Sequence, residues 1–190
     1  MKRDLEENPS EGTLSMTNIS FGNLILSFGH ASKEDKKAFL RKNADKHIYM
    51  DLTCFDPAEF YAEFPQLKGS FAALFCDEEK KVEIHQIESS PEVMKKLIEL
   101  GYKPIETTIV SCGFIFPRTI VQIINEAHFA LEEKVASRED IDRAMKFGVN
   151  YPKGPFEWAQ AREDIVLTLL KELLEKTGDK RYIPSQLLQK

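Results

Sequence analysis

The sequence predicts an α/β half followed by an all-α half. Three observations indicate this order. Short apolar or alternating runs of strand length fill residues 18–110 and are interrupted by helix-like segments with capping residues. Residues 111–190 instead carry longer helix-spaced apolar patterns. Charged residues without periodicity make up the start of the chain. We therefore expect a flexible tail (1–17), an α/β domain (18–110) and a helical domain (111–190).

In the α/β half we expect the order strand–helix–strand–strand–strand–helix–strand in a mostly parallel sheet. The expected strands are 19–28, 47–52, 70–76, 81–87 and 104–110; the expected helices are 32–43 and 90–101, with a short helix or turn at 59–64. Ser32 and Ser90-Pro91 begin the two longer helices, and Gly101 ends the second. The lysines of residues 33–46 share this stretch with Glu34, Asp35 and Asp45, which predicts a solvated face.

The helical half begins with a long helix over 113–133, whose apolar residues cover most of its circumference. Pro117 suits only the first turn of this helix. Ser137 caps a second helix, and we expect Gly148 to end it in the left-handed conformation. Helix-spaced apolar positions then continue to a stop at Gly178. So much apolar surface in so short a domain predicts burial in a two-fold dimer.

Composition limits the class of protein. A chain of 190 residues with 42% hydrophobic and 30% charged residues is typical of a globular protein with a sizeable core. The net charge of −5 argues against non-specific nucleic-acid binding. No apolar run approaches the roughly 20 residues that cross a bilayer, and the first 17 residues do not resemble a signal peptide. Cys54, Cys76 and Cys112 show no metal spacing, so we expect reduced thiols in a cytoplasmic protein without a metal site.

Several runs in the helical half occur in a fixed order. They are Gly113-Phe114-Ile115, Asn125-Glu126-Ala127, Glu139-Asp140-Ile141-Asp142, Ala144–Gly148, Tyr151–Glu157 and Gly178–Ser185. Together they resemble the C-terminal domain of the 3-hydroxyacyl-CoA dehydrogenase family. The resemblance implies a shortened, truncated Rossmann-like domain followed by a helical dimerisation domain. It also implies acyl-CoA or fatty-acid metabolism, a possible acyl-CoA ligand and a homodimer through the C-terminal helices.

Members of this family pass a hydride from a 3-hydroxyacyl-CoA to NAD. A histidine takes the hydroxyl proton, a glutamate orients the histidine, and a serine and an asparagine bind the substrate oxygen. NAD binding needs a Gly-x-Gly-x-x-Gly turn between a strand and a helix. The glycines before residue 110 do not have this spacing. NAD is therefore implied by the resemblance alone, and we expect no cofactor bound in the usual manner.

Two residues of one strand are candidates for the catalytic pair. Glu83, in Lys81-Val82-Glu83-Ile84, matches the family's glutamate; the alternative is an exposed strand carboxylate. The position of the family's histidine falls near Phe71. His85 lies two residues from Glu83, so both share one face of the strand and could pair. The alternative for His85 is a surface or core histidine.

The family's asparagine precedes an arginine, but here Pro117 precedes Arg118. Proline has no side-chain donor or acceptor, so it cannot make this substrate contact. Arg118 is a candidate for a CoA phosphate contact, with a structural ion pair as the alternative. The sequence thus predicts a divergent 3-hydroxyacyl-CoA dehydrogenase-like protein without ordinary NAD-dependent hydride transfer. The alternative is a non-catalytic dimeric scaffold or regulatory subunit. We expect a scaffold to fill the cleft with Phe71, Phe114 and Phe116, and a ligand site to direct polar groups at Glu83 and Arg118.

Overall fold

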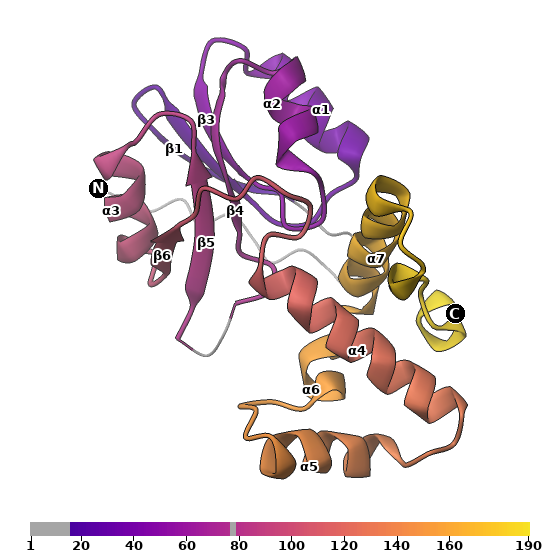
Figure 1. Ribbon diagram of the computed structural model, residues 1–190. Helices are drawn as coiled ribbons and strands as arrows, with labels where there is room; N and C mark the ends of the chain where they lie inside the picture. Colours follow the sequence, from indigo (N-terminus) through magenta and orange to yellow (C-terminus); the bar gives the residue numbers. More distant parts are fainter. Residues whose placement is uncertain (1–15, 77–78) are drawn as a thin grey trace.

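The computed structural model describes residues 16–76 and 79–190, so most of the tail expected at 1–17 lies outside it. Its first half is a six-stranded sheet in the order β1-β2-β3-β4-β5-β6. The strands are β1 (Thr17–Phe21), β2 (Leu24–Phe28), β3 (His47–Asp51), β4 (Leu67–Ala72), β5 (Lys81–Gln86) and β6 (Lys103–Glu106). A helical half follows, which confirms the predicted fold class (Figure 1).

The sheet is mixed, and its strands are neighbours in chain order. The pairs β2–β3, β3–β4 and β5–β6 are parallel, whereas β1–β2 and β4–β5 are antiparallel. The single strand expected over 19–28 is a hairpin, because Gly22 adopts a φ of +61° in the turn between β1 and β2. The expected strand at 104–110 ends early. Beyond Glu106, the hydroxyl of Thr107 accepts a hydrogen bond from the Ile109 N–H, and this local turn replaces the ladder.

Helices cover both faces of the sheet. The helices α1 (Lys33–Lys42) and α2 (Pro57–Glu63) lie on one face, and α3 (Pro91–Glu99) lies on the other (Figure 1). Each begins at a side-chain cap, from Ser32, Asp56 and Ser90 respectively. The expected helix starts at Ser32 and Ser90 are thus confirmed.

The helical half contains α4 (Phe116–Glu132), α5 (Arg138–Gly148), α6 (Pro155–Ala159), α7 (Glu163–Thr177) and the short 3-10 helices η1 (Lys180–Tyr182) and η2 (Gln186–Gln189). Ser137 caps α5 and Gly178 ends α7 with a φ of +66°, as expected. The prediction for Gly148 is wrong. It is the last residue of α5 without a left-handed φ, and Asn150 at +58° reverses the chain instead.

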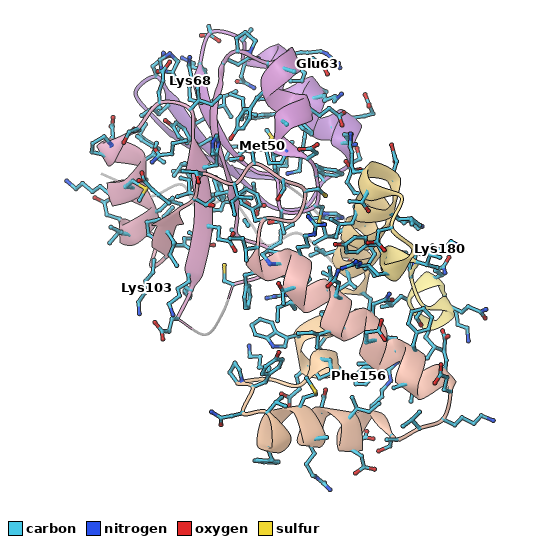
Figure 2. The ribbon with its side chains drawn as sticks, viewed as in Figure 1. Met50, Glu63, Lys68, Lys103, Phe156 and Lys180 are labelled. Atoms are coloured by element: carbon cyan, nitrogen blue, oxygen red, sulfur yellow. The ribbon has the colours of Figure 1, made fainter. Side chains whose placement is uncertain are left out.

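One apolar core joins the two halves. Buried residues of β3 and α2, including Met50 and Phe60, pack in the same cluster as Ile124 of α4 and Leu169 of α7. Figure 2 shows Met50 in this interior and Phe156 between α4 and α5. A second cluster on the other face of the sheet packs against α3. Within the described residues, no helix is long and apolar enough to cross a membrane.

Candidate functional site

Glu83 lies where the two halves meet, and its carboxylate caps α4. Its Oε2 accepts a hydrogen bond from the Ile115 N–H at 2.8 Å, and its Oε1 accepts one from the Phe116 N–H at 2.6 Å. A helix leaves its first N–H groups without partners inside the helix, and its N-terminus favours negative charge. No residue of the α4 N-terminus itself supplies a side-chain cap. The carboxylate from β5 therefore does for α4 what serine or aspartate does for the other helices.

Pro117 completes this arrangement. It occupies the first turn of α4 and has no N–H to satisfy. The next N–H, of Arg118, donates to the Gly113 carbonyl at 3.0 Å. Every N–H of the α4 N-terminus from Ile115 to Arg118 is thus bonded, and both carboxylate oxygens of Glu83 are used.

His85 forms its hydrogen bond with Tyr61 of α2 and not with Glu83. Its Nδ1 lies 3.0 Å from the Tyr61 hydroxyl, which lies 2.7 Å from the hydroxyl of the fully buried Ser70. Burial lowers the pKa of His85 below its usual value, which favours the neutral imidazole. The structure therefore does not pair His85 with Glu83, although both lie on β5. Tyr61 was not singled out in the sequence, because it is 24 residues from His85 and belongs to α2.

Phenylalanine side chains occupy the interior near these groups. Phe71, at the position nearest the family's histidine, is fully buried and packs 4.8 Å from Phe28 between ring centroids. Phe114 is 1% exposed, and Phe116 packs edge-on against Trp158. Phe71 belongs to the core cluster that packs against α3, so it does not fill the cleft between the two halves as expected of a scaffold.

Arg118 is bound within the helical half. Its Nε donates to the Tyr182 hydroxyl at 2.8 Å, and its guanidinium carbon lies 5.3 Å from the centre of the Tyr182 ring. Stacking and a hydrogen bond to the same partner hold the side chain in one place. It lies in the first turns of α4, close to the cap along the chain, but it contacts η1 and not Glu83.

The sheet does not fit the NAD that the family resemblance implies. Dinucleotides bind where the strand order of an open α/β sheet reverses, at the carboxyl ends of the strands. The strands described here run in sequential order without a reversal. At the carboxyl ends of β2 and β3, the Lys36 ammonium donates to the carbonyls of Gly29 (2.9 Å) and Asp51 (2.8 Å). The turn after β2 therefore holds an internal cation.

Lys36 corrects the prediction of a solvated face for residues 33–46. Its side chain is 1% exposed, and it lies one helical turn before the buried Leu40. Burial lowers the Lys36 pKa, and the neighbouring Asp51 carboxylate opposes this shift. The spacing of four residues from Leu40 was the available signal in the sequence.

The helical half matches a known family. Residues 113–190 match the family described as "3-hydroxyacyl-CoA dehydrogenase, C-terminal domain". The 3-hydroxyadipyl-CoA dehydrogenase of Escherichia coli K12 is 49% identical over 78 residues, which are 40% of this chain and 16% of that protein. A probable 3-hydroxybutyryl-CoA dehydrogenase of Deinococcus radiodurans is 35% identical over 112 residues, which are 56% of this chain and 40% of that protein.

The likeness of the fold extends further along the chain. The crystal structure of (S)-3-hydroxybutyryl-CoA dehydrogenase from Ralstonia eutropha aligns with a TM-score of 0.71 at 23% identity, covering 88% of this chain and 64% of that one. The chain spans less than half the length of the curated relatives named above. Residues 113–190 thus match the C-terminal helical domain of the 3-hydroxyacyl-CoA dehydrogenase family.

Proposed function

We propose that this protein serves acyl-CoA or fatty-acid metabolism as a dimeric member of the 3-hydroxyacyl-CoA dehydrogenase family that does not itself transfer a hydride to NAD. The observation that carries the proposal is that Glu83 accepts hydrogen bonds from the Ile115 and Phe116 N–H groups at the N-terminus of α4. A carboxylate that orients a catalytic histidine must have an oxygen within hydrogen-bond reach of that histidine. Among the described residues, no histidine hydrogen-bonds to Glu83, and the nearby His85 bonds to Tyr61 instead.

Three further observations support the same proposal. Pro117 provides no hydrogen bond for a substrate oxygen. Phe71 provides no base and is buried. Arg118 is stacked on Tyr182, which supports its reading as a structural residue. In this proposal, Glu83 joins the α/β half to the helical half, and Arg118 stabilises η1 within the helical half.

Hydride transfer is tested by following NADH absorbance with acetoacetyl-CoA as substrate. We expect no turnover above that of a heat-denatured sample. An active family enzyme in the same assay confirms that the reagents are competent. Turnover by the purified chain that is abolished in Glu83→Gln while the fold remains intact would refute the proposal.

Binding of the substrate is a separate question, answered by calorimetric titration with acetoacetyl-CoA. A scaffold gives no saturable heat. Saturable heat that Arg118→Ala weakens would instead support a second candidate function, a CoA-ester-binding protein without hydride transfer. Lys171→Ala, which removes an exposed cation of α7, is the matched control for charge.

The dimer is proposed to form through α4 and α5. Two apolar hollows of about 460 and 300 Å³ follow α4 and share Ile123. Helix α5 has no buried residue, and its Phe147 is 80% exposed, followed by Val149 at 55%. Exposed apolar side chains and apolar hollows of this kind are typical of an interface. A second copy related by a two-fold axis would cover it with the same surface of its own.

The oligomeric state is measured by light scattering coupled to size exclusion. We expect a dimer for the native chain and a shift toward monomer for Phe147→Glu, because a carboxylate would be buried in the interface. Lys171→Glu changes charge on α7, outside the proposed surface, and should leave the dimer intact. A monomeric native chain at micromolar concentration would reject the dimer without affecting the proposal on hydride transfer.

A further inference from the structure

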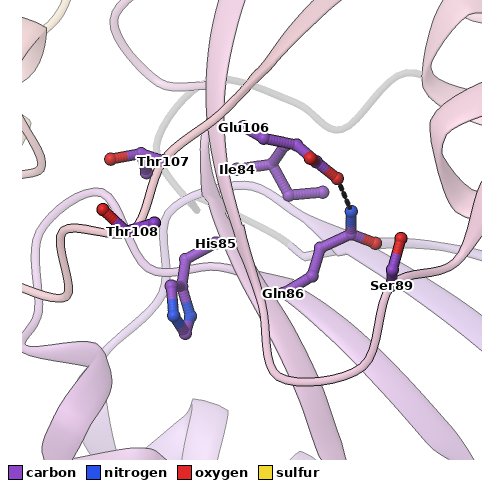
Figure 3. A pocket seen from close by; sticks show the side chains of 7 residues that line it. All are labelled: Ile84, His85, Gln86, Ser89, Glu106, Thr107 and Thr108. Carbon is purple, nitrogen blue, oxygen red and sulfur yellow. Dashed lines mark hydrogen bonds between the residues drawn. The ribbon is translucent and has the colours of Figure 1, made fainter.

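A polar pocket that neither Glu83 nor Arg118 lines is found where β5 and β6 separate. The last hydrogen bond between these parallel strands runs from the Thr107 N–H to the Ile84 carbonyl. Beyond it the chains diverge around a pocket of about 270 Å³. Figure 3 shows the lining residues, Ile84, His85, Gln86, Ser89, Glu106, Thr107 and Thr108. The pocket therefore lies beyond the carboxyl ends of these two parallel strands.

A hydrogen-bond chain lies behind His85. Burial raises the pKa of Tyr61 to about 12, so its hydroxyl stays protonated at neutral pH. In one direction of the chain, Ser70 donates to Tyr61 and Tyr61 donates to Nδ1 of His85. A neutral imidazole that accepts at Nδ1 carries its proton on Nε2. In this tautomer, His85 offers an N–H donor to the pocket that it lines.

Other polar groups of the pocket are held in the same manner. The amide of Gln86 donates to Glu106 at 2.6 Å and accepts from the Ser90 N–H at 3.0 Å (Figure 3 shows the first of these bonds). The hydroxyl oxygen of Thr107 accepts from the Ile109 N–H at 3.1 Å, which leaves its proton free to donate. Groups fixed before binding lose little conformational entropy when a ligand arrives.

The charge and chemistry of the lining select the ligand. The seven lining residues include one carboxylate and three hydroxyls, and no lysine or arginine. Such a lining disfavours anions, because nothing in it compensates the Glu106 charge. We propose that this pocket binds a small neutral polyhydroxylated molecule of the sugar type. His85 donates to a ligand oxygen, and Glu106 accepts from a ligand hydroxyl.

The ligand sits over the edge of β5. Side chains of successive strand residues leave on opposite faces, so His85 and Gln86 reach the pocket from different sides of the sheet. Ile84, which shares the face of Gln86, is fully buried, so the ligand contacts the polar groups around it. The inference does not depend on the proposed function, because it uses neither the α4 cap nor the dimer surface.

The test uses the full ¹⁵N-labelled chain, titrated with D-ribose and with D-glucose up to about 100 mM, since weak sugar sites have millimolar dissociation constants. We expect saturable shifts confined to residues 84–89 and 106–108. His85→Phe keeps a ring of similar size and should weaken binding at least about fivefold. Glu106→Gln should weaken it about threefold. Glu99→Gln, on α3 and outside the pocket, is the matched control.

Three outcomes would overturn the proposal. One is the absence of saturable shifts with either sugar in a sample whose spectrum shows a folded chain. Another is unchanged binding in both pocket variants, which would place the sugar elsewhere. The third is a stronger response to spermidine or to inorganic phosphate than to the sugars, which would assign the pocket to a charged ligand.

Discussion

Replacing Glu83 by alanine removes the cap of α4 and separates the two explanations for this residue. If Glu83 stabilises the helix, the loss appears in the free energy of unfolding. If Glu83 orients a catalytic base, the loss appears in turnover. The structure favours the first, because the carboxylate bonds to Ile115 and Phe116 rather than to a histidine.

The expected magnitude follows from two contributions. Loss of a side-chain cap costs about 1 kcal/mol, within a range of about 0.5–2. Loss of a negative charge at a helix N-terminus costs about 0.3–1 kcal/mol more. We therefore expect Glu83→Ala to lower the free energy of unfolding by about 1–3 kcal/mol. Glu83→Gln keeps one acceptor oxygen and loses the charge, so about half of this loss is expected.

Urea unfolding followed by tryptophan fluorescence measures this change. The chain has a single tryptophan, Trp158, which is buried and packs against Phe116 at the start of α4. Circular dichroism on the same samples tests whether both halves unfold together. For a chain of this size, a loss of about 2 kcal/mol should lower the melting temperature by about 4–8 °C.

A neighbouring carboxylate gives the control. Glu88 follows β5 and forms an exposed ion pair with Lys68 at 3.1 Å, so Glu88→Gln should change stability by less than about 1 kcal/mol. If Glu83→Ala unfolds like Glu88→Gln, the cap contributes nothing measurable and the reasoning fails. The structural role is also refuted if Glu83→Gln has native stability but loses a dehydrogenase activity that the native chain possesses.

Three other predictions concern stability. Gly154→Ala should destabilise the helical half by about 1–2 kcal/mol in urea unfolding, because a β-carbon there would collide with Asp142, whose carboxylate caps α6. Lys36→Met should lower the free energy of unfolding by about 3 kcal/mol, since it leaves the carbonyls of Gly29 and Asp51 and the buried Asp51 carboxylate without the Lys36 ammonium. Equal urea midpoints for the variant and the native chain would contradict this. The hydrogen bond from Lys176 lowers the pKa of Glu59 from 4.5 to about 2, so its stabilising contribution is complete above pH 4.5 and is lost as the pH falls toward 2. In Glu59→Gln, the melting temperature should depend less on pH across that interval. An unchanged dependence on pH would show that other groups cause it.

Local signals predicted most of the helices. Ser32, Ser90 and Ser137 each accept a hydrogen bond from an N–H three residues later. Each capping serine and its partner are therefore close in sequence and can be recognised without the tertiary structure. Gly178 likewise ends α7 through its own left-handed φ. Strand limits were less predictable. Whether residues 107–110 continue the β-ladder depends on the neighbouring strand, and here the turn at Thr107 ends the strand.

The candidate site was predicted in part. The sequence singled out Glu83, His85, Arg118 and Pro117, and it showed that the family's glycine-rich turn is missing. It could not identify their partners. Tyr61 reaches His85 from another element, and Tyr182 reaches Arg118 from 64 residues away.

By itself, the sequence determined the order of an α/β half and a helical half, the capped helices and the family of residues 113–190. These follow from periodicity, from caps that act within one turn, and from a run of matching residues. Only the tertiary structure decided which groups Glu83 contacts. Its two partners lie 32 and 33 residues further along the chain, and α4 has no cap of its own. A carboxylate can orient a base or cap a helix with the same two oxygens, and the fold alone brings one of those partners within reach.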